Sequence, residues 1–199
     1  MSSKNMKTRT TILQATWELL EAARGQEVRM TDIAKRAGVS RQAVYLHFPT
    51  RTDLLVATTL YIDKAKNVDE RLAVSRAAEN GIDRLNAFIE AWGGYIPEIH
   101  GVAKALMIIS DTDEAAKCAW DGRLQAVREG CRAAIDSLDN DGMLSPRYSD
   151  VEATDILSAL LSVHTWEHFT STCGWSQEFY IEKIKALARQ VTVRESSND

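Results

Sequence analysis

Cysteine and long apolar runs are scarce in this sequence of 199 residues, and each scarcity excludes a class of protein, while the 3 prolines fit a mostly helical chain. The 3 cysteines are widely spaced and form no Cys-x-x-Cys pair, which argues against a disulfide framework and against a structural zinc site. The longest apolar run, residues 105–109, is far shorter than the roughly 20 residues that a membrane-spanning helix needs. The first residues are polar and show no secretory signal. We therefore expect a cytoplasmic protein with reduced thiols and no membrane partner.

The charges nearly balance overall but are unevenly distributed along the chain. The formal net charge of −4 argues against a protein that coats nucleic acid indiscriminately. Residues 1–52 hold 9 Lys/Arg against 4 Asp/Glu, whereas residues 53–199 hold 15 against 24. A basic N-terminal part on an acidic remainder confines the field that attracts phosphates to one end of the chain. Chance clustering on a solvated surface is the other interpretation of this asymmetry.

Apolar residues recur at spacings of three and four over most of the chain, and no segment alternates long enough to indicate a sheet. The pattern predicts an all-α fold of about nine helices. Pro97 is expected to close the fifth helix. We place the helices at residues 7–24, 31–37, 41–48, 51–74, 79–96, 102–109, 111–138, 150–170 and 177–193.

Two short helices joined by a tight glycine turn are expected within residues 31–48. Gly38 can take the positive φ that favours the end of the first helix, and Ser40 stands where an N-cap hydroxyl would satisfy free amides of the second. This is the pattern of a helix-turn-helix, whose second helix enters the major groove of DNA. Arg41 and Gln42 then project from its first turn; arginine suits guanine O6/N7 and glutamine suits adenine N6/N7.

These residues resemble the TetR family of transcriptional regulators over about residues 9–55. The helix between the expected head and the rest of the chain begins at Arg51. The loop before residue 31 looks about one residue short of the family's common form, and Arg29 stands where many relatives have a capping Ser or Thr. The residues that carry the resemblance are Arg9-x-x-Ile12, Ile33-Ala34, Ala37-Gly38-Val39-Ser40, Tyr45, His47-Phe48, Arg51 and Leu54-Leu55.

The resemblance and the side-chain chemistry together assign roles in the DNA-binding head. Arg41 and Gln42 are expected to read base edges, and Ala43 is small enough to admit the helix and touch a thymine methyl. The family positions that hold phosphates imply contacts from Tyr45 and His47. We expect further backbone contacts from Arg29, Thr31, Ser40 and Arg51, with Lys4, Lys7 and Arg9 as a loose basic arm.

We divide the chain into a helix-turn-helix domain at residues 1–52, a helical ligand-binding and dimerisation domain at 53–193, and a disordered tail at 194–199. The resemblance implies a small-molecule inducer bound in the helical body. Aromatic and apolar side chains with a few polar anchors could line such a pocket, or they could simply fill the core. The candidates are Trp92, Tyr95, Ile96, His100, Met107, Trp120, Trp166 and Phe169.

The last two expected helices each carry a broad apolar face. These faces either close the core of one subunit or pair with a second copy as a four-helix bundle. Two heads would read a pseudo-palindromic operator, which favours the homodimer. The candidate interface residues are Ile156, Leu160, Val163, Ile181, Ile184, Leu187 and Val191.

Three alternatives remain open at this point. His164, Glu167 and His168 could seat a metal ion in an enzyme, although the His-Glu-x-x-His order and a third ligand are lacking. No serine-nucleophile or phosphate-binding glycine motif is visible, so we expect no catalytic residue and no cofactor. A regulator controlled by a protein partner, or one that activates transcription, also fits the sequence.

Overall fold

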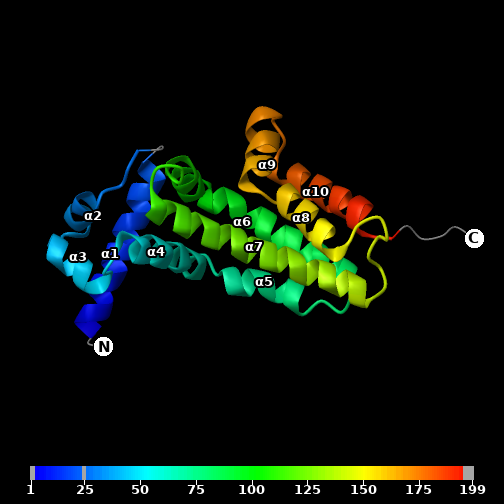
Figure 1. The fold of residues 1–199 in the computed structure, drawn as a ribbon, viewed down its shortest axis with the longest axis horizontal. Coiled ribbons are helices and arrows are strands. Elements are labelled where there is room, and N and C mark those ends of the chain that lie inside the picture. Colours follow the sequence, from blue (N-terminus) through cyan, green and yellow to red (C-terminus); the bar gives the residue numbers. More distant parts are fainter. Residues whose placement is uncertain (1–2, 24–25, 195–199) are drawn as a thin grey trace, which may run out of the picture. The chain divides into compact units, whose positions relative to one another are not determined.

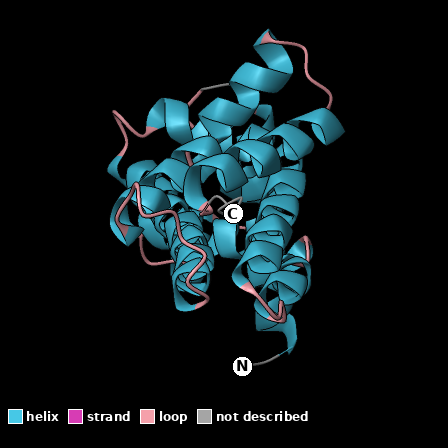
Figure 2. Ribbon diagram, turned by 90° about the vertical axis from the view of Figure 1, so that its right-hand side faces the viewer, coloured by secondary structure: helices cyan, strands magenta, loops and turns pink. Residues whose placement is uncertain are grey.

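The computed structural model describes residues 3–23 and 26–194 and builds them almost entirely from helices (Figures 1 and 2). An isolated bridge joins Leu144 and Val193. The predicted all-α class is confirmed. None of the helices described is both long enough and apolar enough to cross a bilayer. The elements are α1 (Ser3–Ala22), α2 (Met30–Ala37), α3 (Arg41–His47), α4 (Arg51–Ala65), α5 (Val68–Arg76), α6 (Gly81–Ile109), α7 (Glu114–Asn140), α8 (Asp150–Leu160), α9 (Val163–Glu167), the π-helical turn η1 (His168–Thr172) and α10 (Gln177–Thr192).

The chain forms two compact units. One limit between them falls between α4 and α5, and the other two fall inside the long helices α6 and α7. The first unit contains the described residues up to Lys66 together with Ile99–Leu124, and the second contains Asn67–Glu98 and the described residues from Gln125 onward. The expected functional boundary at residue 52 is a different division and stays a prediction. Of the expected tail at 194–199, only Arg194 falls within the described residues.

The first unit is built around α1, which packs against α2 and α4, while α2 packs against α3. Ile12 and Leu20 of α1, Ile33 of α2 and Leu54 of α4 are completely buried in one apolar cluster. This cluster holds the helix-turn-helix on α1. Helix α1 begins at Ser3, so Lys4, Lys7 and Arg9 belong to it, and the expected loose basic arm is wrong.

The expected single helix over residues 51–74 is two helices, α4 and α5. The chain breaks at Asn67, whose φ of 54° is in the left-handed region. Asparagine tolerates this conformation better than most residues because its short polar side chain can bond locally. No glycine or proline marks the break, which is why periodicity alone runs through it.

The prediction that Pro97 ends a helix is wrong, because α6 continues through it to Ile109. Proline has no amide hydrogen to donate to the carbonyl four residues earlier, Gly93 O. In the structure Gly93 O accepts a hydrogen bond of 2.8 Å from Gln177 Nε2 of α10. A side chain from a distant helix therefore satisfies the carbonyl that Pro97 leaves without its helical partner.

The expected helix over 150–170 is also divided. Helix α8 ends at Leu160, and Ser162 caps the start of α9 by accepting a 3.1 Å hydrogen bond from the Thr165 amide. A π-helical turn, η1, then follows α9. Serine is a strong N-cap, so the new helix begins where Ser162 supplies the acceptor.

Candidate nucleic-acid interface

The turn between α2 and α3 has the geometry that the sequence predicts. Gly38 adopts φ 66° and ψ 31°, and its amide donates to the carbonyl oxygens of Ala34 and Lys35. Ser40 Oγ then accepts a 3.1 Å hydrogen bond from the Ala43 amide, which starts α3. The free backbone groups at the end of α2 and at the start of α3 thus find hydrogen-bond partners within three residues. This short turn holds the two helices at a fixed angle.

The apolar seam between the two helices is buried. Ile33 and Val44 are fully buried and Ala34 nearly so, with Ala37 and Val39 packed partly buried against them. This packing fixes which face of α3 looks outward. Arg41, Gln42 and Tyr45 are exposed on that face, while Ala43 and His47 are only partly exposed.

Arg41 and Tyr45 interact with each other along the outer face of α3. The Arg41 guanidinium carbon lies 5.5 Å from the centroid of the Tyr45 ring, and Arg41 Nη2 donates to the Tyr45 hydroxyl at 3.3 Å. An arginine over an aromatic ring is attracted to its π-electrons. The pair holds the guanidinium against the surface of α3.

The start of α2 presents Arg29 and Thr31 to solvent. Arg29 is the N-cap of α2 and its side chain makes no capping bond. It reaches instead to Glu27 at 3.3 Å, with 71% of its side chain exposed. Arg29 therefore keeps a charge at the surface, as a phosphate contact requires.

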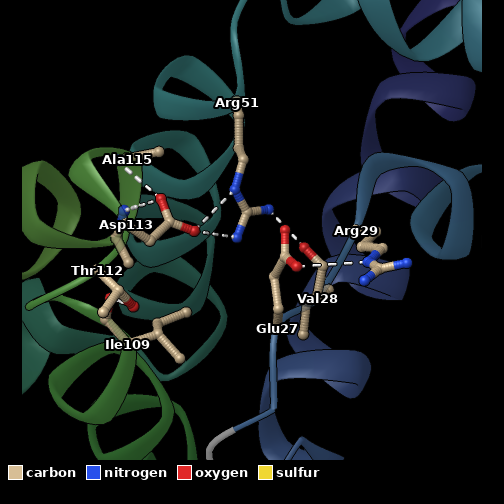
Figure 3. Close-up of polar contacts among 9 residues, drawn as sticks. Glu27, Val28, Arg29, Arg51, Ile109, Thr112, Asp113 and Ala115 are labelled. Carbon is tan, nitrogen blue, oxygen red and sulfur yellow. Dashed lines mark hydrogen bonds and ion pairs between the residues drawn. The ribbon is translucent and has the colours of Figure 1, made fainter.

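Arg51, which the resemblance places on a phosphate, is occupied inside the protein (Figure 3). Its Nε and Nη2 donate to Asp113 Oδ2 at 3.1 and 2.6 Å, and its Nη1 donates to the carbonyl oxygen of Val28. The side chains of Arg51 and Asp113 are only 20% and 17% exposed. A phosphate contact by Arg51 would have to compete with this ion pair.

Asp113 joins the turn between α6 and α7 to the start of α4. Its Oδ1 also accepts from the amides of Ala115 and Ala116 at 2.9 and 3.2 Å, at the beginning of α7. Burial opposes ionisation of this carboxyl, but the hydrogen bonds from Arg51 and the two amides outweigh it. The pKa of Asp113 therefore lies below its ordinary value.

Leu46 is a surface residue of α3 that the sequence interpretation did not single out. It is 79% exposed and stands beside Gln42 and Tyr45 on the outer face. Its exposure could have been predicted from the sequence, because Leu46 is two residues from the buried Val44 and residues two apart lie on nearly opposite sides of a helix.

The eight candidate ligand residues do not form one group within either unit. His100, Met107 and Trp120 belong to the first unit, and the other five belong to the second. Tyr95 and Ile96 are buried, and Trp92 Nε1 donates to the carbonyl oxygen of Leu161 at 2.8 Å. The pocket therefore stays a prediction, with its aromatic part centred on the second unit.

Helices α8 and α10 pack on each other. The candidate interface residues lie on α8, α9 and α10, and they differ in exposure. Val163 and Ile184 are buried inside the single chain, so they contribute to its core. The remaining five, Ile156, Leu160, Ile181, Leu187 and Val191, keep partial or full exposure. These five could meet a second copy.

The candidate metal ligands His164, Glu167 and His168 do not form a metal site. Among the described residues, no group of three or more His, Cys, Asp or Glu side chains is arranged to hold a metal ion. His168 Nε2 instead lies 3.6 Å from Cys173 Sγ, and both histidines are exposed. These contacts give a metal-dependent enzyme no support.

The N-terminal part of the chain matches a known protein family. Residues 12–58 match the family described as bacterial regulatory proteins, tetR family. The nucleoid occlusion factor SlmA of Marinomonas sp. (strain MWYL1) is 35% identical over 106 residues. That match covers 53% of this chain and 53% of the relative, so the chain spans about half the length of the curated relative that it matches.

Solved structures share the fold along nearly the whole chain. A TetR-family regulator from Rhodococcus sp. superposes with a TM-score of 0.73 at 21% identity, covering 94% of this chain and 98% of that one. A transcriptional regulator from Saccharomonospora viridis, in complex with choline, gives 0.74 at 19% identity, with coverage of 96% and 100%. NalD of Pseudomonas aeruginosa superposes with a TM-score of 0.69 at 20% sequence identity, and the match covers 97% of this chain and 99% of NalD. Residues 12–58 therefore match the helix-turn-helix part of the tetR family of bacterial regulatory proteins, and the chain as a whole has the fold of these solved structures.

Proposed function

We propose that this regulator binds a specific duplex DNA sequence through the outer face of α3. The observation that carries the proposal is the exposure of Arg41, Gln42 and Tyr45 on a helix that the buried Val44 anchors to the protein. Arginine and glutamine form paired hydrogen bonds with guanine and adenine in the major groove. Arg29 and Thr31 at the start of α2, with Ser40 and His47, are assigned to the phosphates.

The binding unit in this proposal is a homodimer on a pseudo-palindromic operator. One head with two base-reading side chains discriminates weakly, while two heads a helical turn apart double the contacts. The partly exposed apolar residues of α8 and α10 supply the interface, with Leu187 and Ile156 as examples. The buried Val163 and Ile184 are not part of this interface.

The regulator acts in this proposal as a repressor that a small molecule releases from DNA. Two proteins of the same fold motivate this part: NalD is described as a repressor of a multidrug efflux pump, and the S. viridis structure contains choline. An inducer bound among the aromatic residues of the second unit would change the separation of the two heads. The inducer can weaken DNA binding only by the difference between its affinities for the DNA-binding and the released conformations.

Selection of bound duplexes from a random pool tests DNA recognition directly, because the pool contains every candidate operator. The full-length protein is expected to enrich an inverted repeat and to release it when one member of a metabolite library is added. Enrichment of no sequence would contradict the DNA-binding proposal. An operator complex that no compound dissociates would contradict only the inducer.

A second candidate function follows from the match to the nucleoid occlusion factor. That match of 106 residues is longer than the family match at 12–58, so it extends outside the helix-turn-helix. The alternative is a DNA-bound protein that answers to a protein partner. Mapping bound sites along the chromosome separates the two, because a promoter repressor occupies few sites next to genes and a nucleoid-wide factor occupies many.

A further inference from the structure

Leu46 is the most exposed of the large apolar side chains on the described surface, at 79%. It is not part of the apolar cluster that holds α2 and α3 on α1. The fold of the first unit therefore gains little from a leucine at this position. A solvated helix position of this kind ordinarily carries a polar residue, so an external partner is the more direct explanation.

The geometry of α3 places Leu46 where DNA would approach. Successive residues of an α-helix are about 100° apart around its axis, so Gln42 and Leu46 each lie about 160° from Val44, on either side of the direction opposite the core. By the same count, Arg41 and Tyr45 lie about 60° and 100° from Val44. Gln42 and Leu46 thus project most directly away from the protein and, with α3 in a groove, reach deepest into it.

We propose that Leu46 is a specificity-determining residue that contacts the C5 methyl group of thymine in the operator. This inference rests on the proposed DNA-binding function. The thymine methyl is the apolar group that base pairs present in the major groove, and an apolar side chain is its complement. Gln42, one turn away on the same face, suits adenine. Together the two side chains favour A·T pairs at neighbouring positions of each half-site.

The charge around Leu46 favours DNA over a protein partner as the occupant of this surface. Arg41 is exposed on the same helix, and residues 1–52 hold 9 Lys/Arg against 4 Asp/Glu. A lone leucine among basic and polar side chains is too small an apolar area for a stable protein interface, which buries about 800 Å² on each partner. It is sufficient for one methyl group.

The test compares two forms of one duplex. The sequence enriched from a random pool by the full-length protein is synthesised once with thymine and once with deoxyuridine, which lacks only the methyl group. The wild-type protein is expected to bind the thymine duplex about fourfold more tightly for each methyl contacted, the factor that burial of one such group gives. Leu46→Ala is expected to lose the part of this preference that one methyl contact in each half-site gives.

Leu60→Ala is the matched control, because Leu60 is also an exposed leucine, 54% exposed on α4. It should keep the full preference of the wild type for thymine. A second selection with Leu46→Ala should lose one thymine from each half-site of the consensus and keep the others. Unchanged thermal unfolding of this variant would show that it is folded.

Four outcomes would overturn the inference, and one of them would also contradict the proposed function. If the wild type binds both duplexes equally, or if Leu46→Ala keeps the full thymine preference, Leu46 does not read the methyl group. In both cases sequence-specific binding, and with it the proposed function, stands. If no duplex is enriched at all, the proposed function fails and the inference fails with it. A shift of Leu46→Ala alone from dimer to monomer would assign Leu46 to self-association instead.

Discussion

Arg41 and Arg29 carry the same charge at two different places in the helix-turn-helix. Arg41 is exposed on α3, whereas Arg29 occupies the N-cap position of α2, where its side chain makes no capping hydrogen bond. We predict that Arg41→Ala lowers affinity for the selected operator by about 1–3 kcal/mol and leaves affinity for scrambled DNA nearly unchanged. Competition binding at fixed salt measures both affinities.

The control for this prediction is Arg29→Ala, which removes an equal charge from a predicted phosphate contact. It should weaken binding to operator and scrambled DNA by the same factor and lower the salt dependence of both. Equal effects of the two substitutions on both duplexes would show that the helix-turn-helix does not divide base reading and phosphate contact in this way.

We predict that the main role of Arg51 is to stabilise the fold rather than to contact DNA. Arg51→Met removes the ion pair with Asp113 and the bond to the Val28 carbonyl. We expect the free energy of unfolding at pH 7 to fall by about 1.5–3 kcal/mol, the usual contribution of hydrogen bonds to a charged group. Urea denaturation measures the change, and Arg29→Met, at an exposed ion pair, should cost less than about 1 kcal/mol.

The same ion pair predicts a pH dependence with a definite sign. The pKa of Asp113 is lowered in the folded state, so its contribution to stability is present above its unfolded pKa of about 3.9. This contribution is lost as the pH falls through the lowered value. The difference between wild type and Arg51→Met should therefore shrink below about pH 4. A difference that stayed constant from pH 7 to pH 3 would argue against this role of the pair.

At the scale of single helices, α6 depends on a contact from α10. Gln177 Nε2 donates to Gly93 O, and Gln177 Oε1 accepts from Trp166 Nε1 at 2.8 Å. We predict that Gln177→Met lowers the free energy of unfolding by about 1–3 kcal/mol, because a half-buried carbonyl and an indole N–H lose their partners.

A double-mutant cycle with Pro97→Ala tests the cause. Alanine at position 97 supplies the amide that Gly93 O lacks in the wild type, so Gln177→Met should cost less in that background. Equal costs in both backgrounds would show that the carbonyl at Gly93 does not depend on Gln177. Chemical denaturation of the four proteins gives the coupling energy.

The helix-turn-helix could be predicted from the sequence because its signals are local. Gly38, Ser40 and Pro49 mark the limits of α2 and α3 within a few residues, and the observed helices agree closely. The breaks at Asn67 and Ser162 carry weaker local signals, and periodicity passes through both. Pro97 gave a strong local signal that a contact from a helix 84 residues away in sequence overrides.

The candidate site could be predicted only in part, for the same reason. The outward direction of Gln42 follows from its spacing of two residues to the buried Val44, whereas the exposure of Arg41, three residues from Val44, could not be predicted from that spacing. The partner of Arg51 does not, because Asp113 lies 62 residues away and only tertiary packing brings the two together. The same holds for Val163 and Ile184, whose apolar character fits a core or an interface equally well.

At the scale of the whole molecule, the basic part of the chain carries α3 and the acidic part carries the candidate dimer helices. Residues 53–199 hold 15 Lys/Arg against 24 Asp/Glu, so this part repels phosphates. DNA is therefore drawn to the helix-turn-helix alone. Two copies that join through α8 and α10 would present two such heads to one duplex.

The most direct test of the central claim is the affinity of the full-length protein for its selected duplex and for a scrambled duplex of the same composition, at about 150 mM salt. Specific recognition by paired heads predicts a preference of about a thousandfold or more for the selected sequence. Equal affinity for the two duplexes would contradict the claim that α3 reads a DNA sequence.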